Sequence, residues 1–101
     1  MNLTPVSREY ATFTVAATED GQPVTLTAVD VALLPPRTSP AADTAWTTAD
    51  YSAGVATVLL AGPAADPSGA LVVPVKGADL WVRVTDVSEV DAARVARITV
   101  V

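Results

Sequence analysis

Two segments in the last third of the chain alternate polar and apolar residues, and such a pattern leaves few structures open other than β-strands. The segments are Leu80–Asp86 and Ala92–Val101, with a short acidic stretch between them. Successive side chains of a strand point to opposite faces, so each segment has one face suited to a core and one suited to water or a partner. Two such segments joined by a brief polar connection predict a β-hairpin.

The rest of the chain contains shorter β-rich segments bounded by turn residues such as Asp20-Gly21 and Gly62-Pro63. The other strands are expected at Glu9–Ala17, Val29–Leu34 with a bulge or break near Ala28, Gly54–Ala61 with Ala56, Val58 and Leu60 inward, and Ala70–Val75. About seven short strands predict a single all-β domain over residues 1–101, an antiparallel immunoglobulin-like β-sandwich without a disulfide. A small β-barrel is the alternative architecture.

Three further segments carry specific expectations. Residues 1–7 are predicted to form an extended N-terminal arm, because Pro5 removes a backbone donor and favours extended structure before it. The two prolines that open residues 35–43 exclude a central strand there, so this stretch is predicted to be a loop. Trp46 is predicted to fill the space between the two sheets, as a lone large aromatic side chain in a small β-domain typically does.

The composition argues against several classes of function. The chain has no cysteine and no histidine, so it lacks thiolate chemistry, the commonest metal ligand and the commonest general base. Six basic residues are outnumbered by eleven acidic ones, and the net charge of −5 disfavours binding to nucleic acid. No apolar run approaches the roughly 20 residues that cross a bilayer. We therefore expect no enzymatic activity, no cofactor, and no nucleic-acid or membrane partner.

A cluster of acidic residues near the last turn is the best candidate for a cation site. Asp86, Glu89 and Asp91 lie within six residues of one another, and hard cations such as Ca²⁺ prefer several oxygen ligands. Their spacing does not match the pattern of a calcium-binding loop. A solvated turn explains the same residues, so no metal site is predicted.

Two groups of residues are candidates for a protein interface. They are Trp81, Arg83, Arg94 and Arg97 on the outer face of the last hairpin, and Pro35, Pro36 and Arg37 in the proline-containing loop. Tryptophan and arginine are enriched at the centre of protein interfaces. The alternative for the first group is cation–π packing on an ordinary exposed sheet, and the alternative for the second is a plain exposed loop.

Several turn and strand motifs together resemble a known family. They are Ser7-Arg8-Glu9-Tyr10, Thr18-Glu19-Asp20-Gly21-Gln22-Pro23-Val24, Gly62-Pro63, Leu80-Trp81-Val82-Arg83-Val84-Thr85-Asp86 and Val87-Ser88-Glu89-Val90. This pattern, which covers most of the chain, resembles small structural proteins that tailed phages of actinobacteria encode near their capsid and head-to-tail genes. Such proteins often carry a proline before the glutamate of the last loop, where this chain has Ser88.

The resemblance implies an immunoglobulin-like, non-enzymatic structural protein of a bacteriophage virion, made in the cytoplasm of the bacterial host. Its expected place is the head-to-tail junction, as part of the neck or connector. Its expected partners are other virion proteins, namely the portal or connector or the major capsid protein, and it is expected to be homo-oligomeric in the assembled particle. The first alternative is a capsid decoration or minor capsid protein on the head surface. The second is a carbohydrate-binding or adhesion module.

Overall fold

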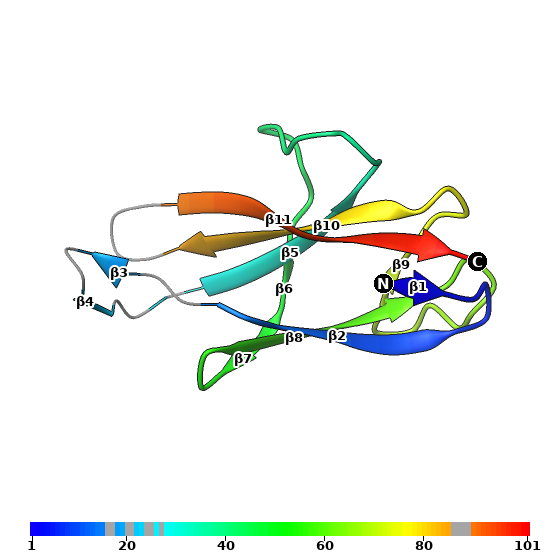
Figure 1. Cartoon of the computed structure of the whole chain (residues 1–101), viewed down its shortest axis with the longest axis horizontal. Coiled ribbons are helices and arrows are strands. Elements are labelled where there is room, and N and C mark those ends of the chain that lie inside the picture. The colour runs from blue at the N-terminus through cyan, green and yellow to red at the C-terminus, as the bar shows by residue number, and fades with distance from the viewer. Residues whose placement is uncertain (16–17, 20–21, 24–25, 27, 86–89) are drawn as a thin grey trace.

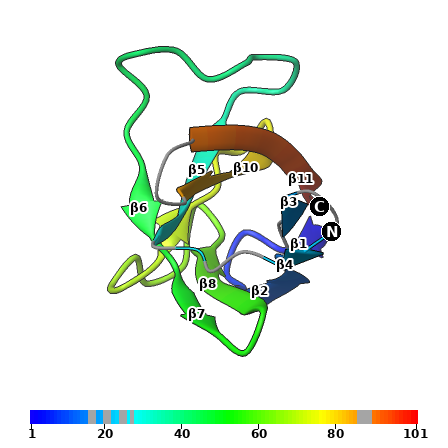
Figure 2. The same ribbon diagram turned by 90° about the vertical axis from the view of Figure 1, so that its left-hand side faces the viewer.

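The computed structural model describes residues 1–15, 18–19, 22–23, 26, 28–85 and 90–101. These residues form eleven strands and no helix, which confirms the all-β prediction. No helix that could span a membrane occurs among them. The strands make two main sheets that lie face to face, and a small hairpin, β3 (Thr18–Glu19) with β4 (Gln22–Pro23), lies near one end (Figure 1, Figure 2).

The first sheet has five strands in the order β1-β11-β10-β5-β6. They are β1 (Asn2–Leu3), β5 (Ala28–Leu34), β6 (Thr47–Thr48), β10 (Ala78–Thr85) and β11 (Val90–Val100). Strands β10 and β11 are antiparallel, so the predicted hairpin is confirmed for the described residues, whereas Asp86 lies outside them. The register shifts between Leu80, which is opposite Ala96, and Trp81, which is opposite Arg94. One extra residue of β11 therefore forms a bulge there.

The second sheet contains β2, β8 and β7 in that order, and β9 pairs with β8 as well. The strands are β2 (Arg8–Thr14), β7 (Asp50–Ser52), β8 (Val55–Ala61) and β9 (Leu71–Val72). Between β7 and β8, Ala53 and Gly54 both have positive φ values, as a tight type I′ hairpin turn requires. Among the described residues, no strand pairing closes either sheet into a barrel.

The first strand of this sheet and its edge strand β9 differ from the sequence-based expectation. Strand β2 begins one residue earlier than predicted and ends at Thr14, and residues 16–17 lie outside the described residues. The predicted strand Ala70–Val75 is reduced to the two residues of β9. Val73 continues it by one hydrogen bond, from its amide to the Ala61 carbonyl at 2.8 Å. Pro74 follows directly and offers no backbone donor, which limits the ladder.

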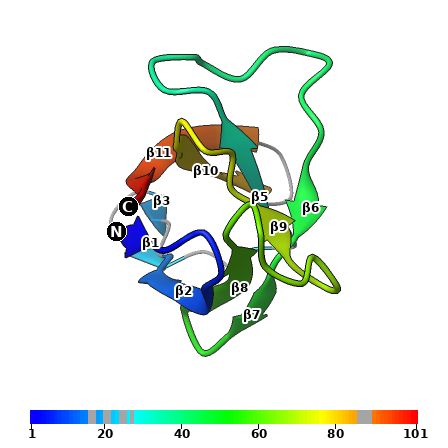
Figure 3. The same ribbon diagram turned by 90° about the vertical axis from the view of Figure 1, so that its right-hand side faces the viewer.

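The two main sheets face each other across the interior (Figure 3). The core between them consists of small aliphatic side chains. Its fully buried members are Leu3, Val31, Ala56, Leu60, Ala61, Val73 and Leu80, together with Val29, Ala78 and Ile98. The inward orientation predicted for Ala56, Val58 and Leu60 is confirmed. The alternation of the last hairpin is confirmed as well, because Leu80 is buried and Val82 and Val84 pack against the core.

The expectation of an extended N-terminal arm is wrong. Leu3 is only 1% exposed, and β1 pairs in parallel with the end of β11. The next residues turn back sharply, and Gly62 lies against the Thr4 and Pro5 carbonyl groups where a Cβ atom would collide with them. The N-terminal residues therefore complete the first sheet and close one side of the core.

The expectation that Trp46 fills the core is also wrong. Trp46 is half-buried, and it directly precedes Thr47 and Thr48, which pair with Val31 and Asp30 of β5. Since side chains alternate along a strand, Trp46 lies on the same side as Thr48, away from the core. The space between the sheets is filled by small aliphatic residues instead.

Candidate functional site

The outer face of the five-stranded sheet brings together charged and aromatic side chains from several strands. Asp79, Trp81 and Arg83 alternate with core residues along β10 and so point away from the core. The chain between β5 and β6, residues 35–46, projects from the same side of the molecule (Figure 2). This face, together with that loop, is called the outer cluster below.

Asp79 lies at the centre of one half of the outer cluster. Its side chain is only 2% exposed, and it accepts hydrogen bonds from Arg97 Nε at 2.9 Å and from Arg97 Nη2 at 3.4 Å. Arg94 Nη1 lies 3.9 Å from the same carboxylate. The backbone amide of Arg37 donates to Asp79 Oδ2 at 3.2 Å, in a turn where Arg37 has the unusual φ of 63°. One carboxylate thus joins β10, β11 and the start of the loop.

Asp30 organises the other half of the outer cluster. Arg83 donates to Asp30 Oδ2 from Nη2 at 2.9 Å and from Nε at 3.3 Å, which is a two-pronged contact. Thr48 Oγ1 donates to Asp30 Oδ1 at 3.2 Å. The guanidinium of Arg83 also lies over the Trp46 ring, 4.8 Å from its centroid. The end of the loop is therefore attached to the sheet by an ion pair and a cation–π contact.

Hydrogen bonding and charge shift the ionisation of Asp79 and Arg97. The guanidinium of Arg97 holds the pKa of the Asp79 carboxyl below its ordinary value, burial opposes this shift, and the Arg37 amide and Arg94 reinforce it. The same contact with Asp79 raises the pKa of Arg97. Both groups therefore stay charged at neutral pH, which is the state in which they attract each other.

Trp81 lies between the two halves and is half-buried. Its indole Nε1–H is buried, yet it has no hydrogen-bond acceptor within the described part of the chain. A buried donor without an acceptor is a cost of about 1–3 kcal/mol. Trp81 thus contributes a partly exposed apolar surface at the middle of the outer cluster, whereas its buried indole donor is not accessible to a partner.

The structure brings together the two groups of residues that the sequence suggested as interfaces. Trp81, Arg83, Arg94 and Arg97 lie on one face, as expected, and the Asp79 carboxylate ties the loop of Pro35, Pro36 and Arg37 to that face. The cation–π contact on this face joins Arg83 to Trp46, which belongs to neither group. Whether these residues bind a partner stays a prediction.

The sequence interpretation missed the two carboxylates that hold the outer cluster together. The predicted hairpin begins at Leu80, but Asp79 is already the second residue of β10. Asp30 stands between two buried valines of β5. An acidic residue inside an otherwise apolar strand is the signal for a buried, paired carboxylate, and it would have identified Asp30 in Val29–Leu34.

No group of three potential metal ligands comes together among the described residues. Asp86 and Glu89 of the acidic cluster lie outside them. Comparisons of the whole chain with protein-family models, curated proteins and solved structures find no match.

Proposed function

We propose that this chain is a non-enzymatic structural protein of a tailed-phage particle that docks onto other virion proteins through the outer cluster. The observation that carries the proposal is the convergence of two tryptophans, three arginines and the loop of residues 35–46 on one face. The carboxylates of Asp30 and Asp79 fix the positions of these groups in the isolated chain. A surface that is already ordered loses less conformational entropy on binding, which favours affinity.

The proposal includes an immunoglobulin-like sandwich as the scaffold. Its support is the strand order: β11-β10-β5 in one sheet and β2-β8-β7 in the other. Immunoglobulin-like domains have the same order when their strands are named in sequence, with G-F-C in one sheet and B-E-D in the other. The chain crosses between the sheets after β6, at Ala49, whose amide donates to the Val29 carbonyl at 2.9 Å.

The head-to-tail junction is the location that we propose, with the resemblance described above as its support. At this location the chain forms a symmetric ring, and many equivalent small contacts together give a stable assembly. A capsid decoration protein uses the same surface but occurs in far more copies. The number of copies per particle therefore separates the two locations.

We expect about a dozen copies of this chain per particle, the number typical of one closed ring. Quantitative mass spectrometry of purified particles, with the major capsid protein as the internal standard, measures this ratio. Hundreds of copies, in a fixed ratio to the capsid protein, would assign the chain to the head surface instead. Its absence from the particles would overturn the proposal of a structural virion protein.

Replacing Arg83 with alanine is expected to reduce incorporation into particles by about tenfold, because the change frees Trp46 and leaves Asp30 without its main partner. The matched control is Arg8→Ala. Arg8 also contacts an aspartate, Asp66 at 3.9 Å, but it lies in β2 of the second sheet. Equal incorporation of both variants, at equal thermal stability, would show that docking does not use the outer cluster.

A further inference from the structure

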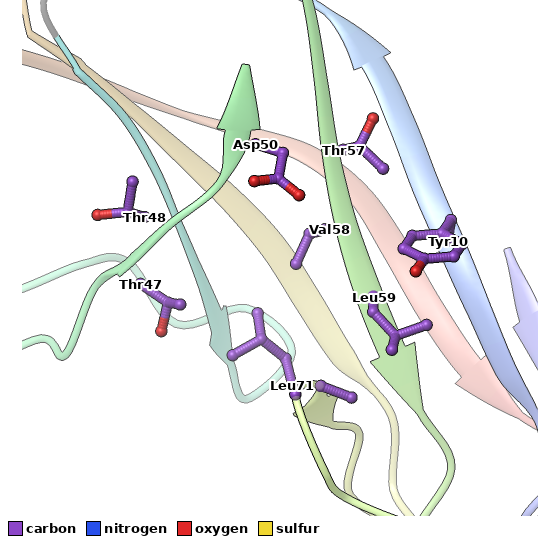
Figure 4. Close-up of a pocket in the computed structure, with 10 residues that line it drawn as sticks. Tyr10, Thr47, Thr48, Asp50, Thr57, Val58, Leu59 and Leu71 are labelled. Atoms are coloured by element: carbon purple, nitrogen blue, oxygen red, sulfur yellow. The ribbon is translucent and has the colours of Figure 1, made fainter. Parts of the chain in front are cut away.

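A groove with a volume of about 460 Å³ lies between the second sheet and β6, next to one edge of the outer cluster (Figure 4). Strands β2, β7 and β8, the short strand β6 and the residues around β9 contribute to its walls. This volume lies within the range of sites that bind small molecules and short oligomers. The groove thus has the size of a small-molecule site.

One wall of the groove is aromatic and apolar. Tyr10 of β2 is 67% exposed, and it is the direct cross-strand neighbour of Leu59 in β8. Figure 4 shows the Tyr10 ring beside Leu59, with Leu71 at the lower end of the groove. A large aromatic ring that is exposed beside a concave surface is a typical platform for the flat, C–H-bearing face of a ligand.

The opposite wall is polar and lacks basic residues. Thr47 and Asp50 line it, and Thr57 of β8, the direct cross-strand neighbour of Asp50, lies between Asp50 and Tyr10. Figure 4 shows Asp50 and Thr57 beside the same stretch of β8. A carboxylate accepts hydrogen bonds, and a threonine hydroxyl both donates and accepts them. The fourth polar residue, Thr48, already donates its hydroxyl to Asp30.

We propose that this groove binds a neutral oligosaccharide, with a sugar ring stacked on Tyr10 and its hydroxyl groups hydrogen-bonded to Asp50 and Thr57. A sugar presents the combination that the groove matches, an apolar C–H face and a rim of hydroxyl groups that donate to a carboxylate. A phosphate or other anion is repelled by Asp50 and finds no basic side chain in the lining. A wholly apolar ligand leaves the carboxylate and the threonine hydroxyls without partners.

The inference can be tested apart from the proposed function, because the residues assigned to the sugar lie on the second sheet. The two surfaces meet at β6, where Thr48 lines the groove and donates to Asp30. The outer cluster is built on β5, β10 and β11, whereas Tyr10, Asp50 and Thr57 belong to β2, β7 and β8. A chain that is attached through the outer cluster can therefore keep the groove open. Binding of sugar and binding of virion proteins are separable in experiments, and either can fail alone.

The test is a titration of the ¹⁵N-labelled full chain, followed by NMR, with cellobiose, maltotriose and N,N′-diacetylchitobiose as probes. We expect saturable shifts of groove residues with at least one probe. Tyr10→Ala should weaken the affinity for that probe by about tenfold, which corresponds to 1.4 kcal/mol. Asp50→Asn should weaken it as well, because a charged acceptor forms the stronger hydrogen bonds.

Thr12 and Thr57 supply a matched pair of variants, since they are cross-strand neighbours on β2 and β8 and only Thr57 lines this groove. Thr57→Val should weaken sugar binding, and Thr12→Val should leave it unchanged. The proposal is overturned if all three probes fail to shift the groove residues at concentrations up to about 20 mM, well above the usual range of weak binding. Equal losses in Thr57→Val and Thr12→Val would overturn it too.

Discussion

Replacing Leu3 with alanine is expected to lower the free energy of unfolding by about 2–5 kcal/mol. The side chain of Leu3 is 1% exposed and belongs to the same core cluster as Leu60 and Leu80. Truncation removes buried methyl groups and leaves a cavity that the neighbouring strands fill only partly. Urea denaturation followed by circular dichroism measures the change, and a shift of the midpoint at constant slope identifies it as a loss of stability.

Val6→Ala is the control for Leu3→Ala, because Val6 lies in the same N-terminal segment but is 71% exposed. Its expected effect is within about 0.5 kcal/mol, as for most surface substitutions. A Leu3→Ala variant as stable as the Val6→Ala variant would show that residues 1–7 form an arm outside the core, as the sequence alone suggested. The two substitutions lie only three residues apart, so a difference in their effects on stability reports burial and not position along the chain. They therefore distinguish a docked strand from a free segment.

The contrast between Leu3 and the last hairpin shows what local patterns can predict. Strands β10 and β11 are long enough for their alternation to be read directly, so the sequence predicted both strands and their core face. Strands β1, β6 and β7 have only two or three residues. An alternation of polar and apolar residues cannot be recognised over two or three residues. These short segments become strands because they pair with the edge of a longer strand.

The same distinction separates the predictable from the unpredictable part of the candidate site. Alternation placed Trp81 and Arg83 on one outward face, and this placement needed no knowledge of the tertiary structure. The contact between the Arg37 amide and Asp79 joins residues 42 positions apart. Trp46 was assigned to the core on the basis of residue type alone, but the pairing of the next two residues with β5 turns it outward. Which residues contact each other over such distances depends on the whole fold, so local sequence patterns do not predict it.

The Asp79→Asn variant is expected to be less stable than the natural chain at neutral pH, with a melting temperature lower by about 5–10 °C. The change removes the charge that Arg97 and Arg94 face from β11, and it weakens the acceptor of the Arg37 amide in the loop. Because Asp79 joins three segments of the outer cluster, the loss should also loosen residues 35–46 relative to the sheet. Faster amide exchange of Thr38, whose amide donates to the Pro35 carbonyl at 3.1 Å, reports that loosening.

The pH dependence of this effect has a defined sign. The pKa of Asp79 is lower in the folded chain than its ordinary value, chiefly through the Arg97 guanidinium. A carboxyl group of this kind stabilises the fold fully above its unfolded pKa of about 4, and the contribution is lost as the pH falls through the lower, folded pKa. The natural chain and Asp79→Asn should therefore differ most at neutral pH and converge in acid, in thermal melts recorded between about pH 2 and pH 7.

Asp43→Asn is the control for Asp79→Asn, since it also removes one negative charge and lies in the same loop, where Asp43 is exposed. A general effect of net charge would act equally in both variants, whereas an effect of the carboxylate that joins β10, β11 and the loop appears only at Asp79. A difference between the natural chain and Asp79→Asn that stays constant from neutral pH into acid would contradict the ion pair as its cause. It would point instead to hydrogen bonding, because asparagine has nearly the shape of aspartate but replaces one acceptor oxygen by an NH₂ donor.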